Sequence, residues 1–328
     1  MKRALTVGVY DPKLIMQASP YPGDNVFAKG FEKNDYKVIR FDYRGTDDPN
    51  KHLLELVEAF GNDFDIIWFG KCERILPETI KKMRQILSGA VFCKWAADVR
   101  TVPTVHDLAH NQCIDYFFGT FGGDYLKKHL LPNMKAVASI LTFTDSDFYK
   151  QINVSYLPSE YKTDILWTGR RGFGDNPIRN EVIDFLTKYE KANVKIAGLS
   201  DWLGSPDYQH YINGAKIGIG ANSFNRKKYS SDRIGNYMAC GTFYLAHYFE
   251  GIEEIFERGV ELDWFKTIEE MEEKIDYYLS HEKERKQIAK NGKYFVLKHF
   301  DCKPLVANIL NIIETGKSNY KWDEIYAN

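Results

Sequence analysis

Cysteine is scarce in this chain of 328 residues, and the few cysteines present form no pattern. Their number is odd and they lie far apart, with no C-x-x-C pair among them: Cys72, Cys93, Cys113, Cys240 and Cys302. This arrangement argues against a disulfide framework, because such frameworks use an even set of cysteines at short spacings. It is typical of reduced thiols in a cytoplasmic protein.

Long hydrophobic runs are also absent. No segment approaches the roughly 18 consecutive apolar residues that a membrane-spanning helix needs. The opening residues MKRALTVGVYD hold no apolar stretch long enough for a signal peptide, and they are typical of a first β-strand. Both observations agree with the cysteine pattern, so we expect a cytoplasmic protein without a membrane span.

The chain has almost no net charge, because 44 lysines and arginines oppose 45 aspartates and glutamates. A charge of −1 supplies no general attraction for nucleic acid. The distribution is uneven, however, since residues 162–233 hold twelve basic and eight acidic residues, whereas residues 234–328 hold twelve and seventeen. The excess positive charge therefore lies in one segment, where it would favour a phosphorylated ligand.

Strand and helix patterns alternate along the chain and predict two α/β domains. A chain of this length exceeds the size at which a single core usually stops growing. Short links between the alternating patterns favour parallel, doubly wound sheets. We expect one Rossmann-like domain in residues 1–157, a second in 158–303, and a last helix with an aromatic tail in 304–328. The strand candidates are 4–10, 37–41, 64–69, 91–96, 116–119 and 139–144, then 164–168, 194–197, 217–220 and 243–246.

The most informative segment is SSDRIGNYMACG, residues 230–241. It predicts a short amphipathic helix that carries Arg233 and Asn236 and ends at Gly241, followed at once by an apolar strand. A helix start at a sheet edge favours anions such as a diphosphate, because its free N–H groups and its dipole are positive. Ser231, Arg233 and Asn236 are therefore candidate ligand-binding residues.

In each half of the chain, a loop that contains glycine follows the first predicted strand. The loop SPYPGDN contains Gly23, which would let the backbone approach a ligand closely. The loop GRRGFG, residues 169–174, carries Arg170 and Arg171. Arg179 lies just beyond it and is a weaker candidate, with a cap or an ion pair of its own helix as the alternative role.

The sequence MACG, with the polar Asn236 four positions before the cysteine, resembles the donor-binding segment of GT-B glycosyltransferases. Ser231 and Arg233 fit the S-x-R pattern of the CgeB-like (spore maturation protein) branch, which has bacterial and phage members. The likeness covers most of residues 164–302. It implies two facing Rossmann-like domains, with the acceptor in the first, the nucleotide-sugar donor in the second, and a C-terminal helix that crosses back to the first domain. By this resemblance Gly23, Arg170 and Arg171 also contact the donor, and the arginines neutralise its diphosphate.

The segment departs from the retaining members of that fold at two positions. Many of them carry two glutamates eight positions apart, the second of which holds the ribose of the nucleotide. Here those positions hold Lys228 and Asn236. The Asn236 amide can still bond hydroxyl groups as donor and acceptor. The missing carboxylates leave the stereochemical course of the reaction open.

An inverting transfer would need a general base, which should come from the first domain. Asp98 follows a strand candidate, where the carboxyl end of a strand delivers residues to a site, and it is our first candidate. His106 is the second, because its ordinary pKa lies near neutrality. A structural cap is the alternative role for Asp98.

Two sequence patterns suggest metal sites. They are alternatives to a site in which arginines neutralise the diphosphate. Asp145-Ser146-Asp147 follows an apolar run, as the metal-binding D-x-D of other glycosyltransferases does. His106 and His110, with Cys113, have the helical i, i+4 spacing of zinc ligands but lack the glutamate of H-E-x-x-H. We expect no metal, since the arginines can supply the positive charge.

The sequence thus predicts a glycosyltransferase that moves a sugar from a nucleotide-sugar co-substrate to a hydroxyl acceptor. The resemblance implies a UDP-sugar as the donor, and we expect no cofactor. The acceptor could be a glycan, a protein or a hydroxymethylated DNA base, and the phage members would place the protein in a host cytoplasm. Two alternatives stay open: a non-catalytic module that binds sugar nucleotides or glycans, and a metal-dependent D-x-D enzyme.

Overall fold

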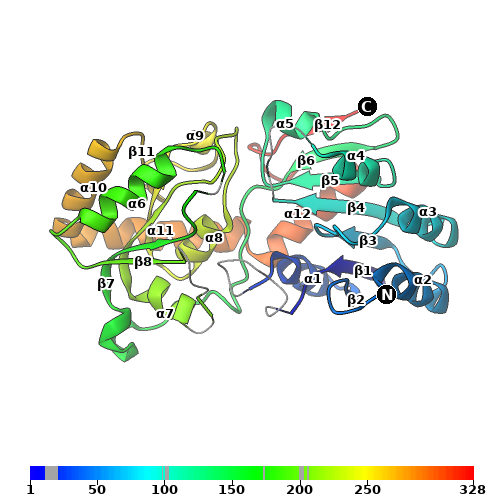
Figure 1. Cartoon of the computed structure of the whole chain (residues 1–328), viewed down its shortest axis with the longest axis horizontal. Coiled ribbons are helices and arrows are strands. Elements are labelled where there is room, and N and C mark those ends of the chain that lie inside the picture. Colours follow the sequence, from blue (N-terminus) through cyan, green and yellow to red (C-terminus); the bar gives the residue numbers. More distant parts are fainter. Residues whose placement is uncertain (12–20, 98, 100–102, 173, 199–202, 205–206) are drawn as a thin grey trace. The chain divides into compact units, whose positions relative to one another are not determined.

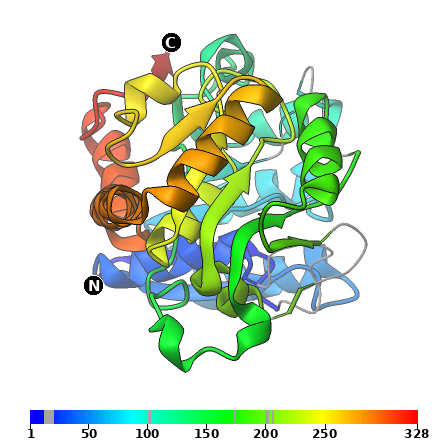
Figure 2. The same cartoon turned by 90° about the vertical axis from the view of Figure 1, so that its left-hand side faces the viewer.

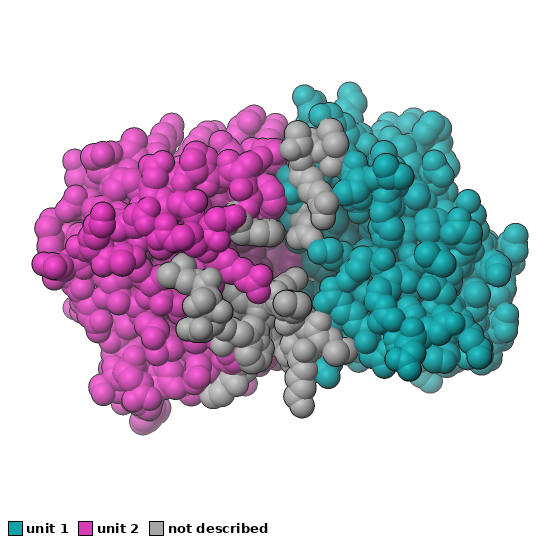
Figure 3. Space-filling model, viewed as in Figure 1, with its two compact units in different colours: residues 1–16, 21–141, 302–328 teal, residues 17–20, 142–301 magenta. Residues whose placement is uncertain are grey.

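The computed structural model describes the whole chain except residues 12–20, 98, 100–102, 173, 199–202 and 205–206. The described residues form two compact units. The first holds those up to residue 141 together with residues 302–328, and the second holds residues 142–301 (Figure 3). The sequence pattern placed these boundaries at 157/158 and 303/304. Residues 142–157 pack with the second unit, where the Ile152 N–H donates to Asn213 Oδ1 at 2.7 Å.

The first unit is built on one sheet with the strand order β12-β6-β5-β4-β3-β1-β2. The strands are β1 (Arg3–Gly8), β2 (Lys37–Asp42), β3 (Ile66–Phe69), β4 (Val91–Ala96), β5 (Tyr116–Gly119), β6 (Ala136–Ser139) and β12 (Ile325–Ala327). All neighbours pair in parallel except β12, which runs antiparallel to β6. The helices are α1 (Gly23–Lys33), α2 (Pro49–Phe60), α3 (Pro77–Ile86), α4 (Val105–Asn111), α5 (Gly123–Lys127) and α12 (Cys302–Thr315) (Figure 1).

Aromatic residues fill the core of the first unit. The ring centroid of Trp68 on β3 lies 5.0 Å from that of Phe27 on α1 and 5.4 Å from that of Phe118 on β5. All four residues of β3 are buried, as expected for a parallel strand covered on both faces. The C-terminal α12 packs against α1, so the last helix does return to the first unit.

The second unit has its own sheet, with the order β11-β10-β9-β7-β8 and parallel pairing throughout. Its strands are β7 (Thr163–Thr168), β8 (Val194–Ala197), β9 (Ala215–Gly220), β10 (Phe243–His247) and β11 (Asp263–Phe265). Its helices are α6 (Ile178–Lys188), α7 (Asp207–Gly214), α8 (Asp232–Ala239), α9 (Ile252–Ile255), α10 (Ile268–Ser280) and α11 (Glu282–His299). Short 3₁₀ turns cover Val154–Tyr156 and Ser159–Tyr161.

Apolar faces join the helices of the second unit to its sheet. Met271 and Ile275 of α10 are fully buried against Ile217 and Leu245 in one hydrophobic cluster. In Figure 2, α10 runs across the face of this sheet. Full burial of such a side chain stabilises the fold by about 1.5–3 kcal/mol, so this seam is a main source of stability for the unit.

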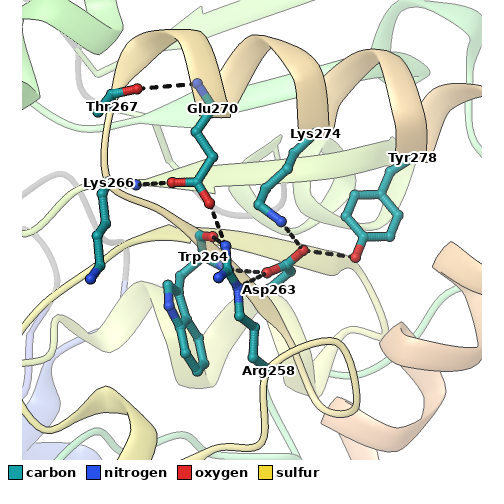
Figure 4. A network of polar contacts seen from close by, with 8 residues as sticks. All are labelled: Arg258, Asp263, Trp264, Lys266, Thr267, Glu270, Lys274 and Tyr278. Carbon is teal, nitrogen blue, oxygen red and sulfur yellow. Dashed lines mark hydrogen bonds and ion pairs between the residues drawn. The ribbon is translucent and has the colours of Figure 1, made fainter.

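A polar network fixes β11 to α10 (Figure 4). The Asp263 carboxylate accepts hydrogen bonds from Arg258 Nε at 3.0 Å, Lys274 Nζ at 2.6 Å and the Tyr278 hydroxyl at 2.8 Å. Asp263 is only 3% exposed. Burial by itself would raise its pKa, but these three donors lower the pKa below its ordinary value. Asp263 is therefore held as an anion inside the unit.

One predicted strand is wrong in its extent. The apolar run 139–144 suggested a strand throughout, but β6 ends at Ser139. Leu141 has a φ of 48°, in the left-handed region that breaks a strand. Residues 142–144 are buried as well, but they belong to the second unit and not to the sheet of the first. In the described part of the chain, the helices are too short or too polar to cross a bilayer.

Candidate functional site

Hydrogen bonds join two loops at the carboxyl edge of the second sheet. One loop follows β7 and the other follows β9. The Asn176 amide nitrogen donates to the Asn222 carbonyl at 3.0 Å, and the Asn222 amide nitrogen donates to the Tyr229 carbonyl at 2.6 Å. Asn222 Oδ1 also accepts from the Ser231 N–H at 3.2 Å. These bonds hold the start of α8 at the edge of the sheet.

Two arginines meet beside Gly169, at the end of β7. A Cβ built on Gly169 would lie 2.4 Å from Arg179 Nη2 and 3.2 Å from Arg233 Nη1, so both guanidinium groups reach this backbone. Gly169 has a φ of +133°, which side-chain-bearing residues rarely adopt. Glycine is therefore required here both by the backbone and by the arginines.

Arg179 is held rigidly although it is charged and only 2% exposed. Its Nε donates to the Arg170 carbonyl at 3.0 Å and its Nη1 to the Ala221 carbonyl at 2.6 Å. Its guanidinium lies 5.1 Å from the centre of the Trp167 ring. Burial, with the nearby charge of Arg233, lowers the pKa of Arg179 to about 9. No described carboxylate forms an ion pair with this guanidinium, so a bound anion would stabilise it.

Two buried polar atoms at the start of α8 lack a hydrogen-bond partner among the described residues. They are Arg233 Nε and Ser231 Oγ. Ser231 precedes the first residue of α8, but its side chain does not cap the helix. A buried polar group left unpaired costs about 1–3 kcal/mol. Together with the helix dipole, these groups make the edge suited to an anion with several acceptor oxygens, such as a diphosphate.

Asn236 lies one turn further along α8 and is 2% exposed. Its amide nitrogen donates to Asp232 Oδ2 at 3.3 Å, and its amide oxygen accepts from Thr144 Oγ1 at 3.3 Å. The amide thus has internal partners, and a contact between Asn236 and a ribose stays a prediction. Burial raises the pKa of Asp232, and its nearby charge raises the pKa of Arg233.

The loop arginines Arg170 and Arg171 are both exposed, and their contact with a donor stays a prediction. Arg171 pairs with Asp184 at 2.5 Å. Arg179, the weaker candidate in the sequence, is the residue that lies with Arg233 beside Gly169. Its place in the first turn of α6, directly after a glycine-rich loop, was the only sequence signal for this role.

The candidates of the first unit are placed in part. Gly23 is the first residue of α1. His106 lies on α4, half-buried, with its ring 4.1 Å from that of His110. Asp98 lies outside the described residues, and its role stays a prediction. The zinc alternative loses support, because His110 Nε2 lies 2.7 Å from the Ile75 carbonyl oxygen and His110 Nδ1 lies 3.5 Å from Lys94 Nζ, so both ring nitrogens have partners.

The D-x-D pair does not present two similar carboxylates. Asp145 is fully buried and accepts from the Asp147 N–H at 3.0 Å, whereas Asp147 is exposed. The Ser146 hydroxyl and N–H bind Asp301 at 2.9 and 2.8 Å. In this conformation the tripeptide is used to anchor the chain near the unit boundary.

The sequence analysis missed one acidic residue, Asp24 on α1. It is 9% exposed and accepts hydrogen bonds from the Val9 N–H and from Trp95 Nε1, both at 2.8 Å. Its only sequence signal was its place directly after Gly23. The contacts come from Val9, which follows β1, and from Trp95 on β4, and these residues lie far apart in the sequence.

Comparison with known proteins agrees with this fold. Residues 179–311 match the family model described as "Glycosyl transferase-like". HepE from Anabaena, solved with UDP-glucose, is 12% identical, with a TM-score of 0.63 over 96% of this chain and 100% of that chain. Sucrose-phosphate synthase from Thermosynechococcus elongatus is 12% identical, with a TM-score of 0.58 over 95% and 98%. A glycosyltransferase from Rickettsia africae is 15% identical, with a TM-score of 0.57 over 95% and 98%.

These structures show that the chain has the α/β GT-B fold. The family match spans most of the second unit and continues into α12, and it supports a glycosyltransferase-like protein. No curated protein matched the chain. The CgeB-like branch and the phage origin stay predictions.

Proposed function

We propose that this protein transfers a sugar from a UDP-sugar to a hydroxyl acceptor. The observation that carries the proposal is the pair of arginines, Arg179 and Arg233, gathered beside Gly169 at the start of α8. Arg233 Nε and Ser231 Oγ, which have no hydrogen-bond partner in the described part of the chain, supply donors for the diphosphate oxygens. UDP is the proposed nucleotide because HepE, a structure of the same fold, was solved with UDP and with UDP-glucose.

The chemistry explains why two fixed cations matter. As the bond between the sugar and the diphosphate breaks, the leaving UDP gains negative charge. Guanidinium groups already in place bind this charge more strongly in the transition state than in the ground state, which accelerates the step. In the proposed mechanism they do what a divalent cation does in D-x-D enzymes, and the nucleotide sugar is a co-substrate, with no further cofactor.

Arg233→Gln tests the diphosphate site. Losing one charge-assisted hydrogen bond costs about 1.5–3 kcal/mol, which corresponds to a roughly 10- to 150-fold weaker UDP affinity by calorimetry. Arg40→Gln is the matched control, because Arg40 is an exposed residue of β2 in the first unit and pairs with Glu32. The control should bind UDP as the wild type does. Equal UDP affinities for all three proteins, with unchanged thermal stability, would contradict the proposed site.

A second candidate function, a non-catalytic sugar-nucleotide module, rests on one observation. Lys228 and Asn236 replace the glutamates of retaining members, and Lys228 is 2% exposed and paired with Glu254 at 2.5 Å. An assay of UDP release from UDP-glucose distinguishes the enzyme from the module. It is run first without an acceptor and then with added glycans, proteins or hydroxymethylated DNA. Turnover supports the enzyme, whereas tight binding without UDP release supports the module. Turnover that persists in excess EDTA supports the arginine mechanism, and rescue by manganese would support Asp145 and Asp147 instead.

A further inference from the structure

Side chains fix the loop between β9 and α8 to its surroundings within the second unit. Where the loop starts, Asn222 bonds both the Tyr229 carbonyl and the Ser231 N–H. Further along, Arg226 Nη2 donates to Asp175 Oδ2 at 2.6 Å, which joins the loop to the one after β7. A lysine three residues before Ser231 makes a further attachment, on the side of the loop that faces α9.

That lysine, Lys228, has its side chain inside the protein. Only 2% of the residue is exposed, although a lysine usually keeps its charged end in water. Its Nζ pairs with Glu254 Oε2 on α9 at 2.5 Å, and its backbone N–H donates to the Glu250 carbonyl at 2.7 Å. The other oxygen, Glu254 Oε1, lies 3.8 Å from Lys227 Nζ. Lys228 therefore joins the loop to the segment in which α9 begins.

The backbone of Lys228 has an unusual conformation. Its φ is 54°, in the left-handed region that residues with a Cβ seldom adopt. Such a conformation persists only where the surrounding contacts enforce it. Gly251 leaves the space for these contacts, because a Cβ built on it would lie 2.7 Å from Lys228 Cγ. The stem of the lysine thus reaches Glu254 past a residue that has no side chain.

The residues after Lys228 lead directly to the proposed diphosphate site. Tyr229 and Ser230 are buried, and Ser231 and Arg233 follow at the start of α8. A close-packed segment transmits a displacement instead of absorbing it. A change in the position of Lys228 should therefore move the groups that are placed to meet the phosphate oxygens.

We propose that Lys228 is a positioning residue of the diphosphate site. Its ion pair with Glu254 sets where the loop ends and hence where Ser231 and Arg233 lie. This inference rests on the proposed function, because it takes these two residues to bind the diphosphate of UDP. Lys228 acts through the loop and α8, without contact with the nucleotide. The lysine at the position of a retaining glutamate then supports donor binding.

Glu254→Gln tests the ion pair and leaves the loop sequence unchanged. Removing a negative charge from the unit that binds UDP would by itself strengthen UDP binding, because it reduces the repulsion of the phosphates. Loss of positioning has the opposite sign, and we expect roughly three- to tenfold weaker UDP affinity by calorimetry. Glu253→Gln is the matched control, because Glu253 is the preceding residue of α9 and is exposed. It should bind UDP at least as tightly as the wild type, and the same result for Glu254→Gln overturns the inference.

A double-mutant cycle separates positioning from direct contact. If Lys228 acts through the pair, Lys228→Met and Glu254→Gln each weaken UDP binding, and the double variant loses no more than the weaker-binding single variant. If Lys228 Nζ met the phosphates itself, Glu254→Gln would free it and strengthen binding, whereas Lys228→Met would weaken binding with either residue at position 254. This second pattern, or fully additive losses, overturns the inference.

Gly251→Ala displaces the stem of Lys228 and keeps both charges. Gly259→Ala is its matched control, because Gly259 also has a positive φ, +77°, but nothing lies within 4 Å of the added Cβ. Backbone strain should lower the unfolding temperature of both variants. Only Gly251→Ala should bind UDP more weakly at a temperature where both are folded. A merely structural role of Lys228 would lower stability and leave the two UDP affinities equal, which overturns the inference.

Failure of the proposed function is recognised separately. A wild type that does not bind UDP, or an Arg233→Gln protein that binds UDP as the wild type does, removes the proposed site and this inference with it. If Arg233→Gln weakens UDP binding, while Glu254→Gln and Gly251→Ala do not, the diphosphate site stands and only the positioning role of Lys228 is overturned.

Discussion

Gly169 is the residue on which the arrangement of the donor site depends most directly. Its backbone has a φ of +133°, and Arg179 and Arg233 lie against the face where a side chain would project. The position therefore couples backbone conformation to the placement of two charges.

Gly169→Ala should weaken UDP binding by at least tenfold, because the new methyl group would displace the Arg179 guanidinium. Gly172→Ala is the matched control: its φ of +67° is also positive, but nothing lies within 4 Å of the added Cβ. Each variant should lose about 1–3 kcal/mol of stability from backbone strain. Only Gly169→Ala should lose UDP affinity in calorimetry, and an equal loss in both would show that strain alone is responsible.

The sequence predicts single site residues unevenly. Ser231 and Arg233 could be found because the start of α8 is a local pattern of glycine, polar and apolar residues. Arg179 could not, because its role depends on how the loops after β7 and β9 close around it through Asn176 and Asn222. Asp24 is a similar case, since its partners Val9 and Trp95 lie far apart in the sequence.

At the scale of elements, local signals define most boundaries. Asp48 Oδ1 accepts from the Lys51 N–H at 3.0 Å at the start of α2, and Thr267 caps α10 in the same way. Apolar runs such as Ile66–Phe69 are fully buried strands, and these were predicted nearly to the residue. The strands missed are β11 and β12, because three residues are too few for a pattern and their pairing partners decide the outcome.

Asp263→Asn should destabilise the second unit, because Lys274 loses its buried counter-charge. We expect about 3 kcal/mol, the lower end for a broken buried pair, since Arg258 is partly exposed. Glu273→Gln removes the same charge from the exposed side of α10 and should change stability by less than about 0.5 kcal/mol. Urea unfolding measures both, and equal midpoints would contradict the role of the network.

The role of Asp263 also predicts how the stability of the wild type and of Asp263→Asn depends on pH. The pKa of Asp263 is lowered in the folded state, so its stabilisation is present above the unfolded value of about 4 and is lost as the pH falls through the folded value. The wild type should therefore lose more stability than Asp263→Asn between neutral pH and pH 3. Parallel pH curves for the two proteins would contradict this linkage.

At the scale of the whole molecule, each unit has its own core and its own sheet. A two-state description of unfolding is therefore not expected to hold. UDP binds the second unit in our proposal, and at a hundredfold its Kd it stabilises that unit by about 2.7 kcal/mol.

Calorimetry should show two transitions, of which UDP raises one. Gly30→Ala should lower the other, because the added Cβ would lie 2.3 Å from Val306 Cγ2 and would separate α1 from α12 in the first unit. Hydrogen exchange by mass spectrometry assigns each transition to its residues. A single transition that responds to both UDP and Gly30→Ala would show that the two units unfold together.

The order of the chain has a consequence for synthesis on the ribosome. Among the described residues, the second unit is continuous in sequence from residue 142 to residue 301, whereas the first is completed only by α12 and β12. Until those last elements emerge, α1 lacks the helix that covers it and β6 lacks its edge partner. Domains usually fold from the N-terminus onward during translation. Here the second unit should instead finish folding before the first, whose elements β1 to β6 stay incompletely packed until α12 and β12 have emerged.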